Sequence, residues 1–94
     1  MIVVIAPAAE ADMGEILDFI ALDNPGRAES FVDEIIDRCL DISDFPEAGT
    51  ARPDVADGAR SIVHGRYLIL YRLRPGEVRI ERIVHGSRTL PDIS

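Results

Sequence analysis

The chain has 94 residues and a formal net charge of −7, and 47% of its residues are hydrophobic. A chain of this length predicts a single domain over residues 1–94. The hydrophobic content excludes a disordered chain, and the acidic total argues against direct binding to nucleic acid.

No segment of the sequence carries a signal for export or membrane insertion. No apolar run approaches the roughly 20 residues that span a bilayer. The opening MIVVIAP lacks the basic region and the long apolar region of a signal peptide. Cys39 is the single cysteine, which excludes an internal disulfide. We therefore expect a cytoplasmic protein without membrane contact.

Charge is divided unequally along the chain. Residues 1–58 contain 14 acids and 3 arginines, a sum of −11, whereas residues 59–94 contain 3 acids and 7 arginines, a sum of +4. The planar guanidinium of arginine binds carboxylates through two parallel hydrogen bonds. The asymmetry as a whole predicts a partner-binding surface in the second part, although cross-strand ion pairs on a solvated sheet would explain any one arginine.

The first 41 residues predict one strand and two helices. Residues 2–5 are a β-branched run, and Pro7 then suits the first turn of a helix. Through residues 9–21 apolar side chains recur at spacings of three and four, opposite a face of acids, which predicts an amphipathic helix. Asn24 would cap the second helix and Pro25 would open it. Two helices joined by so short a turn predict an antiparallel hairpin.

The second helix carries two neighbouring apolar stripes. One contains Phe31, Ile35 and Cys39, and the other contains Val32, Ile36 and Leu40. A stripe this wide predicts contact with both the first helix and a sheet. It also makes Cys39 a buried structural thiol rather than a nucleophile.

The segment FPEAGTARPDVADG, residues 45–58, predicts a long loop. Its length is at the limit for a structureless connection, which hints at function or mobility. From residue 59 the apolar period becomes two and predicts strands at 59–64, 67–73 and 78–85. The middle strand is apolar on both faces and should be central. The expected order β-α-α-β-β-β is an α+β fold, with the helical hairpin on one face of a small, mostly antiparallel sheet.

The alternation also predicts core residues, namely Tyr67, Ile69, Tyr71, Val78 and Ile80. Continued without a break, it places Arg82 on the inward face. Either a bulge after Glu81 shifts the register and turns Ile83 inward, or Arg82 lines a polar pocket. We favour the pocket, because a buried guanidinium needs a partner and Glu81 would face the other way.

Four segments resemble, in order, the ParE branch of the RelE/ParE superfamily of bacterial toxins. They are NPGRAESFVDEI, FPEAGTARPD, GARSIVHGRYLILYRL and VRIERIVHGSRTLP, and the resemblance runs from about residue 7 to residue 91. It implies the RelE/ParE-like fold and a toxin of a type II toxin–antitoxin system. ParE-like toxins are associated with poisoning DNA gyrase, whereas RelE-like relatives cut mRNA on the ribosome. Both are held inactive in a hetero-oligomer by an antitoxin, here a ParD-like protein, whose extended C-terminal arm wraps the toxin.

Two sets of residues are candidates for partner contact. The segment 85–94 has no periodic pattern, so we expect it to contribute little to the core and to be mobile when free. Only Leu90 and Ile93 would anchor it. Its His85, Arg88 and Leu90 are the candidates for target contact. For an acidic, amphipathic antitoxin tail lying across the hairpin and the sheet, the candidate carboxylate-binding residues are Arg60, Arg66 and Arg72.

Catalysis is the alternative for the same surface. If the chain were a ribosome-dependent endoribonuclease, His85, Arg82 and Arg60 would supply acid–base chemistry and phosphate stabilisation. The acidic charge and the absence of lysine argue against an enzyme that approaches a polyanion. A non-toxic binding module of the same fold is a third interpretation.

No cofactor or metal is expected. His64 and His85 have no cysteine or carboxylate at ligand spacing. We interpret His64 as a polar residue that ends a strand. His85 is expected to end the last strand and to help form a partner-binding edge, not to act as a general base.

Overall fold

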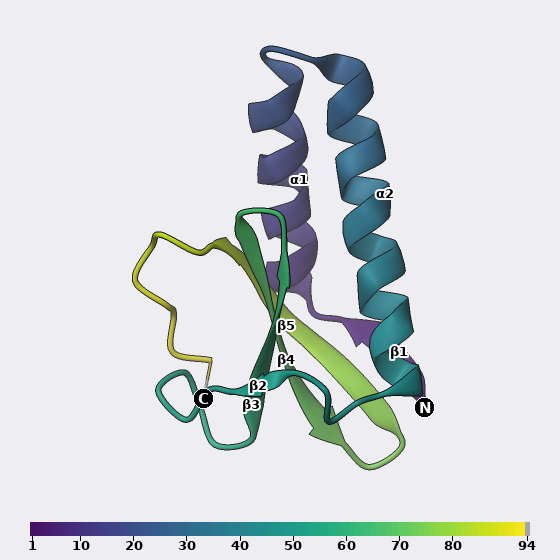
Figure 1. Ribbon diagram of the computed structural model, residues 1–94, viewed down its shortest axis with the longest axis vertical. Helices are drawn as coiled ribbons and strands as arrows, with labels where there is room; N and C mark the ends of the chain where they lie inside the picture. The colour runs from purple at the N-terminus through teal and green to yellow at the C-terminus, as the bar shows by residue number, and fades with distance from the viewer. Residues whose placement is uncertain (94) are drawn as a thin grey trace.

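The computed structural model describes residues 1–93, in which helices precede most of the strands (Figure 1). Along the chain the elements are β1 (Ile2–Ile5), α1 (Pro7–Ala21), α2 (Pro25–Asp41), the 3-10 helix η1 (Ile42–Asp44), β2 (Thr50–Ala51), β3 (Ala59–His64), β4 (Tyr67–Arg74) and β5 (Glu77–His85). The predicted α+β order is confirmed, with one addition. The segment predicted to be a structureless loop contains the short strand β2.

The described strands form a single mixed sheet with the order β1-β5-β4-β3-β2. β1 runs parallel to β5, and the other neighbours are antiparallel. β4 is the middle strand, as its apolar residues on both faces predicted. The helical hairpin covers one face and extends past the strands at its tip (Figure 1). Within residues 1–93, no helix is long and apolar enough to cross a membrane.

The predicted signals at the helix ends are those that the structure uses. Pro7 and Pro25 each begin a helix, where no intrahelical N–H is needed. The Asn24 side chain accepts a hydrogen bond of 3.1 Å from the Arg27 N–H, which satisfies one of the donors left open in the first turn of α2. These local contacts set the short reversal between α1 and α2.

The main core lies between the hairpin and the sheet. The predicted core residues Ile69, Tyr71, Val78 and Ile80 are fully buried there, and Tyr67 packs against them while remaining partly exposed. Cys39 is also buried, and its burial raises the pKa of the thiol to about 12. At neutral pH the thiol is therefore protonated, which fits a structural role.

Tyr71 also fixes the path of the chain before β2. Its hydroxyl donates a hydrogen bond of 2.7 Å to the Pro46 carbonyl and accepts one of 3.1 Å from the Gly49 N–H. A Cβ atom at Gly49 would lie only 2.5 Å from this hydroxyl oxygen, so the close approach requires glycine. The first part of the predicted loop is therefore attached to the core by a buried side chain.

The register of β5 shifts at Glu81. Leu70 pairs with Arg82 whereas Tyr71 pairs with Ile80, so Glu81 is an extra residue on β5. This β-bulge turns Ile83 into the main core, where it is 2% exposed. The preference for an unbroken alternation is therefore wrong, because the bulge is present. Arg82 nevertheless lines a pocket, where it pairs with the Asp12 carboxylate, so elements of both alternatives occur together.

A second apolar cluster lies on the far face of the sheet, away from the helices. Its buried members are Val55, Ala56, Ala59, Leu68, Leu70 and Val84. Leu90 and Ile93 pack against it, and Arg72 Nη2 donates a hydrogen bond of 3.0 Å to the Ile93 carbonyl. The two predicted anchors are therefore the ones used, and the C-terminal segment contributes more packing than the sequence predicted.

Candidate functional site: a groove between the hairpin and the sheet

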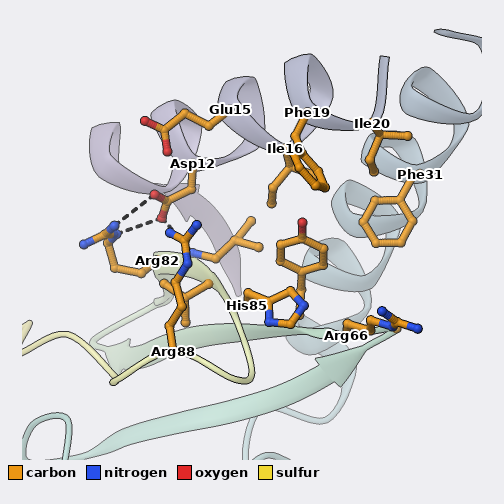
Figure 2. Close-up of a pocket in the computed structure, with 14 residues that line it drawn as sticks. Asp12, Glu15, Ile16, Phe19, Ile20, Phe31, Arg66, Arg82, His85 and Arg88 are labelled. Carbon is orange, nitrogen blue, oxygen red and sulfur yellow. Dashed lines mark hydrogen bonds and ion pairs between the residues drawn. The ribbon is translucent and has the colours of Figure 1, made fainter. Parts of the chain in front are cut away.

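A groove with a cavity volume of about 690 Å³ lies between the helical hairpin and the ends of β4 and β5 (Figure 2). Its apolar lining comes from both layers and consists of Ile16, Phe19, Ile20, Phe31, Tyr67, Ile83 and Val84. Phe19 is 68% exposed, although it is one of the largest apolar side chains of the protein. Exposed apolar surface in a concave site is typical of a protein-binding surface.

Charged residues surround this apolar lining unevenly. Asp12 and Glu15 lie on the α1 side, whereas the cations Arg66 and Arg88 come from the turn before β4 and from the segment after β5 (Figure 2). Both arginines are exposed, and neither guanidinium makes a hydrogen bond or ion pair with another described residue. They are therefore available to carboxylates of a bound partner.

One end of the groove is closed by an ion pair between α1 and β5. Asp12 is 7% exposed, and its carboxylate accepts hydrogen bonds from Arg82 Nε at 2.7 Å and Arg82 Nη2 at 2.9 Å. It also accepts the Ile83 N–H at 2.9 Å. The hydrogen bonds with Asp12 raise the pKa of the Arg82 guanidinium, against the opposing effect of desolvation. Arg82 is thus neutralised within the chain, and α1 is attached to β5 just after the bulge.

His85 lies on the floor of the groove with its imidazole held locally. Its Nδ1 atom accepts the Ser87 N–H at 3.2 Å and lies 2.6 Å from Ser87 Oγ. Tyr67 packs edge-on against the ring, with centroids 5.4 Å apart. Since a backbone N–H can only donate, the neutral imidazole carries its proton on Nε2. Neither ring nitrogen then offers a free lone pair to a substrate hydroxyl.

At the opposite end of the groove, aromatic rings of α2 and the sheet pack against one another at tilted angles. Phe31 of α2 lies 5.6 Å from the Tyr67 ring and 5.4 Å from the His64 ring, measured between centroids. His64 Nε2 lies 3.1 Å from a carboxylate oxygen of Glu34, which also pairs with Arg27. The hydrogen bonds from Arg27 and then His64 lower the pKa of Glu34. His64 ends its strand as predicted, and it also joins α2 to the β3–β4 turn.

Comparison with known proteins identifies the family. The chain matches the model of the ParE toxin of the type II toxin–antitoxin system, parDE, over residues 3–90. It belongs to the ParE toxin family. A solved structure described as the chromosomal ParDE TA system from P. aeruginosa has a TM-score of 0.78 and 23% sequence identity, and the match covers 90% of this chain and 95% of that chain. That likeness shows a shared fold. No curated protein matches the sequence.

In this ParE family member the three arginines predicted to bind an antitoxin do not lie together. Arg66 lines the groove. Arg60 points to the helix side of the sheet, where its Nη1 donates to the carbonyls of Glu47 at 3.0 Å and Gly49 at 2.9 Å. Arg72 lies on the far face and pairs with Glu81 at 2.8 Å. Two of the three guanidiniums are therefore already used within the chain.

The residues predicted for target contact are divided in a similar way. His85 and Arg88 line the groove, whereas Leu90 packs against the far-face cluster. Of the residues assigned to a nuclease, His85 and Arg82 line the groove, but Arg60 does not. Among the described residues, no group of three His, Cys, Asp or Glu side chains could hold a metal ion.

Two residues of α1 were missed by the sequence analysis. Asp12 was counted among the acids on the solvent-exposed face of the helix, and Phe19 was given no role. Asp12 follows Ala9 by three residues and precedes Ile16 by four, so an acid occupies an apolar-stripe position. That spacing is the signal for a buried carboxylate that requires a partner. The identity of that partner, Arg82, depends on the fold.

Proposed function

We propose that this ParE family member is a growth-inhibiting toxin that acts on DNA gyrase in the cytoplasm and is neutralised by a ParD-like antitoxin bound in the groove. The observation that carries the proposal is the family match over residues 3–90. The groove adds a physical basis, because it combines an exposed apolar lining with two arginines that have no partner within residues 1–93. An acidic, amphipathic segment is complementary to such a surface.

Neutralisation follows from the shared location of the two functions. His85 and Arg88, two of the three residues assigned to target contact, line the same groove as Arg66, the one predicted antitoxin-binding arginine that has no partner among the described residues. An antitoxin segment in the groove therefore covers the surface that the target would need. Apolar contacts would carry most of the affinity, and the arginines at the rim would mainly increase the association rate.

Ribosome-dependent cleavage of mRNA has less support. A nuclease of this kind needs a group that accepts the proton of a ribose hydroxyl. Both nitrogens of the neutral His85 ring are engaged or protonated in the observed arrangement. Arg60 also donates to loop carbonyls instead of facing the groove.

Inducible expression without antitoxin separates the functions. We expect growth arrest with filamentous cells and a DNA-damage response, together with inhibition of purified gyrase in a supercoiling assay. Immediate arrest of translation with mRNA cut at ribosomal A sites would establish the nuclease. Normal growth, with the purified chain still binding its antitoxin, would indicate a non-toxic binding module.

A further inference from the structure

The last part of β5 has an open side that faces the groove. β1 pairs with β5 only from Glu77 to Ile80, and its final contact is the hydrogen bond from the Ala6 N–H to the Ile80 carbonyl at 2.9 Å. β5 continues to His85. Its residues Ile83, Val84 and His85 line the groove on the side where β1 has ended.

The antiparallel ladder determines which backbone groups face that open side. Ile83 directs its N–H away from β4, because this N–H donates to the Asp12 carboxylate at 2.9 Å. The direction alternates along a strand, so Val84 faces β4 and His85 faces the open side again. The Gly86 N–H, which donates to the Arg66 carbonyl at 2.8 Å, fits this alternation.

Two of the four outward backbone groups are already used. Asp12 takes the Ile83 N–H, and the Arg88 N–H donates to the His85 carbonyl at 3.1 Å. The Ile83 carbonyl and the His85 N–H remain, with no strand of residues 1–93 beside them. These two groups flank Val84, and in a parallel ladder one residue of the added strand bonds to just such a pair.

We propose that an extended segment of the antitoxin docks parallel to β5, with one residue bonding to the Ile83 carbonyl and the His85 N–H. This inference rests on the proposed antitoxin binding in the groove. An antiparallel segment would also reach both groups, but one of its carbonyls would face the Asp12 carboxylate. One of its N–H groups would face the His85 carbonyl, which already accepts from Arg88. In the parallel direction a single residue bonds to both groups. Only the carbonyl two residues before it and the N–H two residues after it would meet the occupied groups, so a short parallel segment avoids both conflicts.

The docking mode predicts a side-chain pattern in the partner. The bonded residue lies beside Val84 and points to the far face of the sheet, as Val84 does. The residues before and after it point to the helix side, toward Ile16 and Phe19. We therefore expect apolar residues directly before and after the bonded residue, which itself can be of any type. Acidic residues elsewhere in the segment should be placed to reach Arg66 or Arg88. Two hydrogen bonds set its direction and register, and the apolar side chains supply the affinity.

A pair of substitutions at one position isolates the backbone contact. His85→Ala removes the imidazole and keeps the N–H, whereas His85→Pro removes both. Because this N–H points away from β4, proline deletes no hydrogen bond of the sheet. We expect the proline variant to bind the ParD-like antitoxin roughly 3- to 10-fold more weakly than the alanine variant. Equal affinities of the two folded variants would overturn the proposal.

Amide hydrogen exchange on the unmodified complex tests the same contact even if the proline variant fails to fold. The His85 amide should exchange at least about 10-fold more slowly in the complex than in the chain alone. The Ile83 amide is the internal control, because Asp12 already accepts its hydrogen bond. An unchanged rate at His85, or equal slowing at both amides, would contradict strand docking.

Spin labels at the two ends of the antitoxin segment test its direction. In the parallel arrangement the N-terminal label lies near Asp12 and the C-terminal label near Gly65, and each label broadens the NMR signals of the residues near it. Broadening near Gly65 by the N-terminal label and near Asp12 by the C-terminal label would overturn the parallel direction.

Phe19→Asp separates this inference from the proposed function. If that change leaves binding intact, the antitoxin lies outside the groove, and both the docking mode and the proposed antitoxin site fail. If it weakens binding while the two His85 variants bind equally, only the docking mode fails.

Discussion

On the far face of the sheet a buried carboxylate lies between two arginines, whereas beside the groove two other arginines have no partner among the described residues. Glu81 is 8% exposed, with Arg72 Nη2 at 2.8 Å and Arg79 Nε at 2.6 Å. The contact with Arg79 is an ion pair without hydrogen-bond geometry. Arg66 and Arg88 project from the turns around the groove. The same residue type therefore stabilises the fold in one region and remains available for binding in the other.

Position on the sheet explains the difference. The far-face arginines lie within strands, where cross-strand neighbours hold them next to a carboxylate. The groove arginines lie outside the strands, at residues 66 and 88, and their side chains extend toward the concave surface. Substitutions on the far face should therefore reduce stability, and substitutions at the groove should reduce binding.

The largest expected effect is at Glu81. Glu81→Ala leaves Arg72 and Arg79 without their common counter-charge, and breaking a buried ion pair costs about 3 kcal/mol or more. We expect about 3 kcal/mol less stability, since the two arginine side chains are 20% and 32% exposed and can partly hydrate. Urea unfolding gives the value, with Arg88→Ala as the comparison, expected within about 0.5 kcal/mol of the unmodified chain. A small loss at Glu81 would remove the distinction between the two regions.

The next effect is at Asp12, a groove carboxylate that, like Glu81, is buried and paired with an arginine. Asp12→Ala leaves the Ile83 N–H without an acceptor and releases Arg82, which is 33% exposed and becomes hydrated. We expect a loss of about 2 kcal/mol, mainly from the unsatisfied N–H. Asp12→Asn keeps an acceptor for that N–H and should lose about half as much. Equal losses in thermal or urea unfolding would show that the charge, and not the backbone contact, dominates.

A smaller effect is expected on binding at the groove. Arg66→Ala and Arg88→Ala should each weaken antitoxin binding by about 1 kcal/mol at low salt, chiefly through slower association. Arg74→Ala is the matched control, because Arg74 is also exposed but lies at the end of β4, outside the groove. Surface plasmon resonance at two salt concentrations measures both rates. Similar losses for all three variants would indicate a general effect of charge instead of a defined site.

The elements were predictable from the sequence because each depends on spacing within one short segment. The caps at Pro7 and Asn24 and the two-residue period of β4 are of this kind. The bulge at Glu81 is not, because it exists only relative to the register of a neighbouring strand. Most of the candidate site likewise depends on contacts between segments that are far apart in the chain.

The arginines illustrate this limit. Arg60 and Arg72 were predicted to act together, but Arg60 pairs with Tyr71 on the helix side and Arg72 pairs with Ala59 on the far side. Arg82 and Asp12 are 70 residues apart in the chain. No local pattern connects such residues. The sequence therefore named residue types that suit a binding surface, and the structure places only some of the named residues at the candidate groove.

The smallest effect concerns pH and the contact between α2 and the β3–β4 turn, beside the aromatic end of the groove. Arg27 and His64 both contact Glu34 and lower the pKa of its carboxyl below 4.5, the value for an unperturbed glutamate. A lowered pKa in the folded state adds stability above the unfolded pKa, and this stability is lost as the pH falls through the folded pKa. Glu34→Gln should therefore reduce the melting temperature near pH 6 and make it less sensitive to acid between about pH 5 and 3. Asp33→Asn is the control, because Asp33 is exposed and makes no ion pair with a described residue. If both variants lose melting temperature in parallel on acidification, Glu34 does not contribute to the attachment of α2 to the β3–β4 turn.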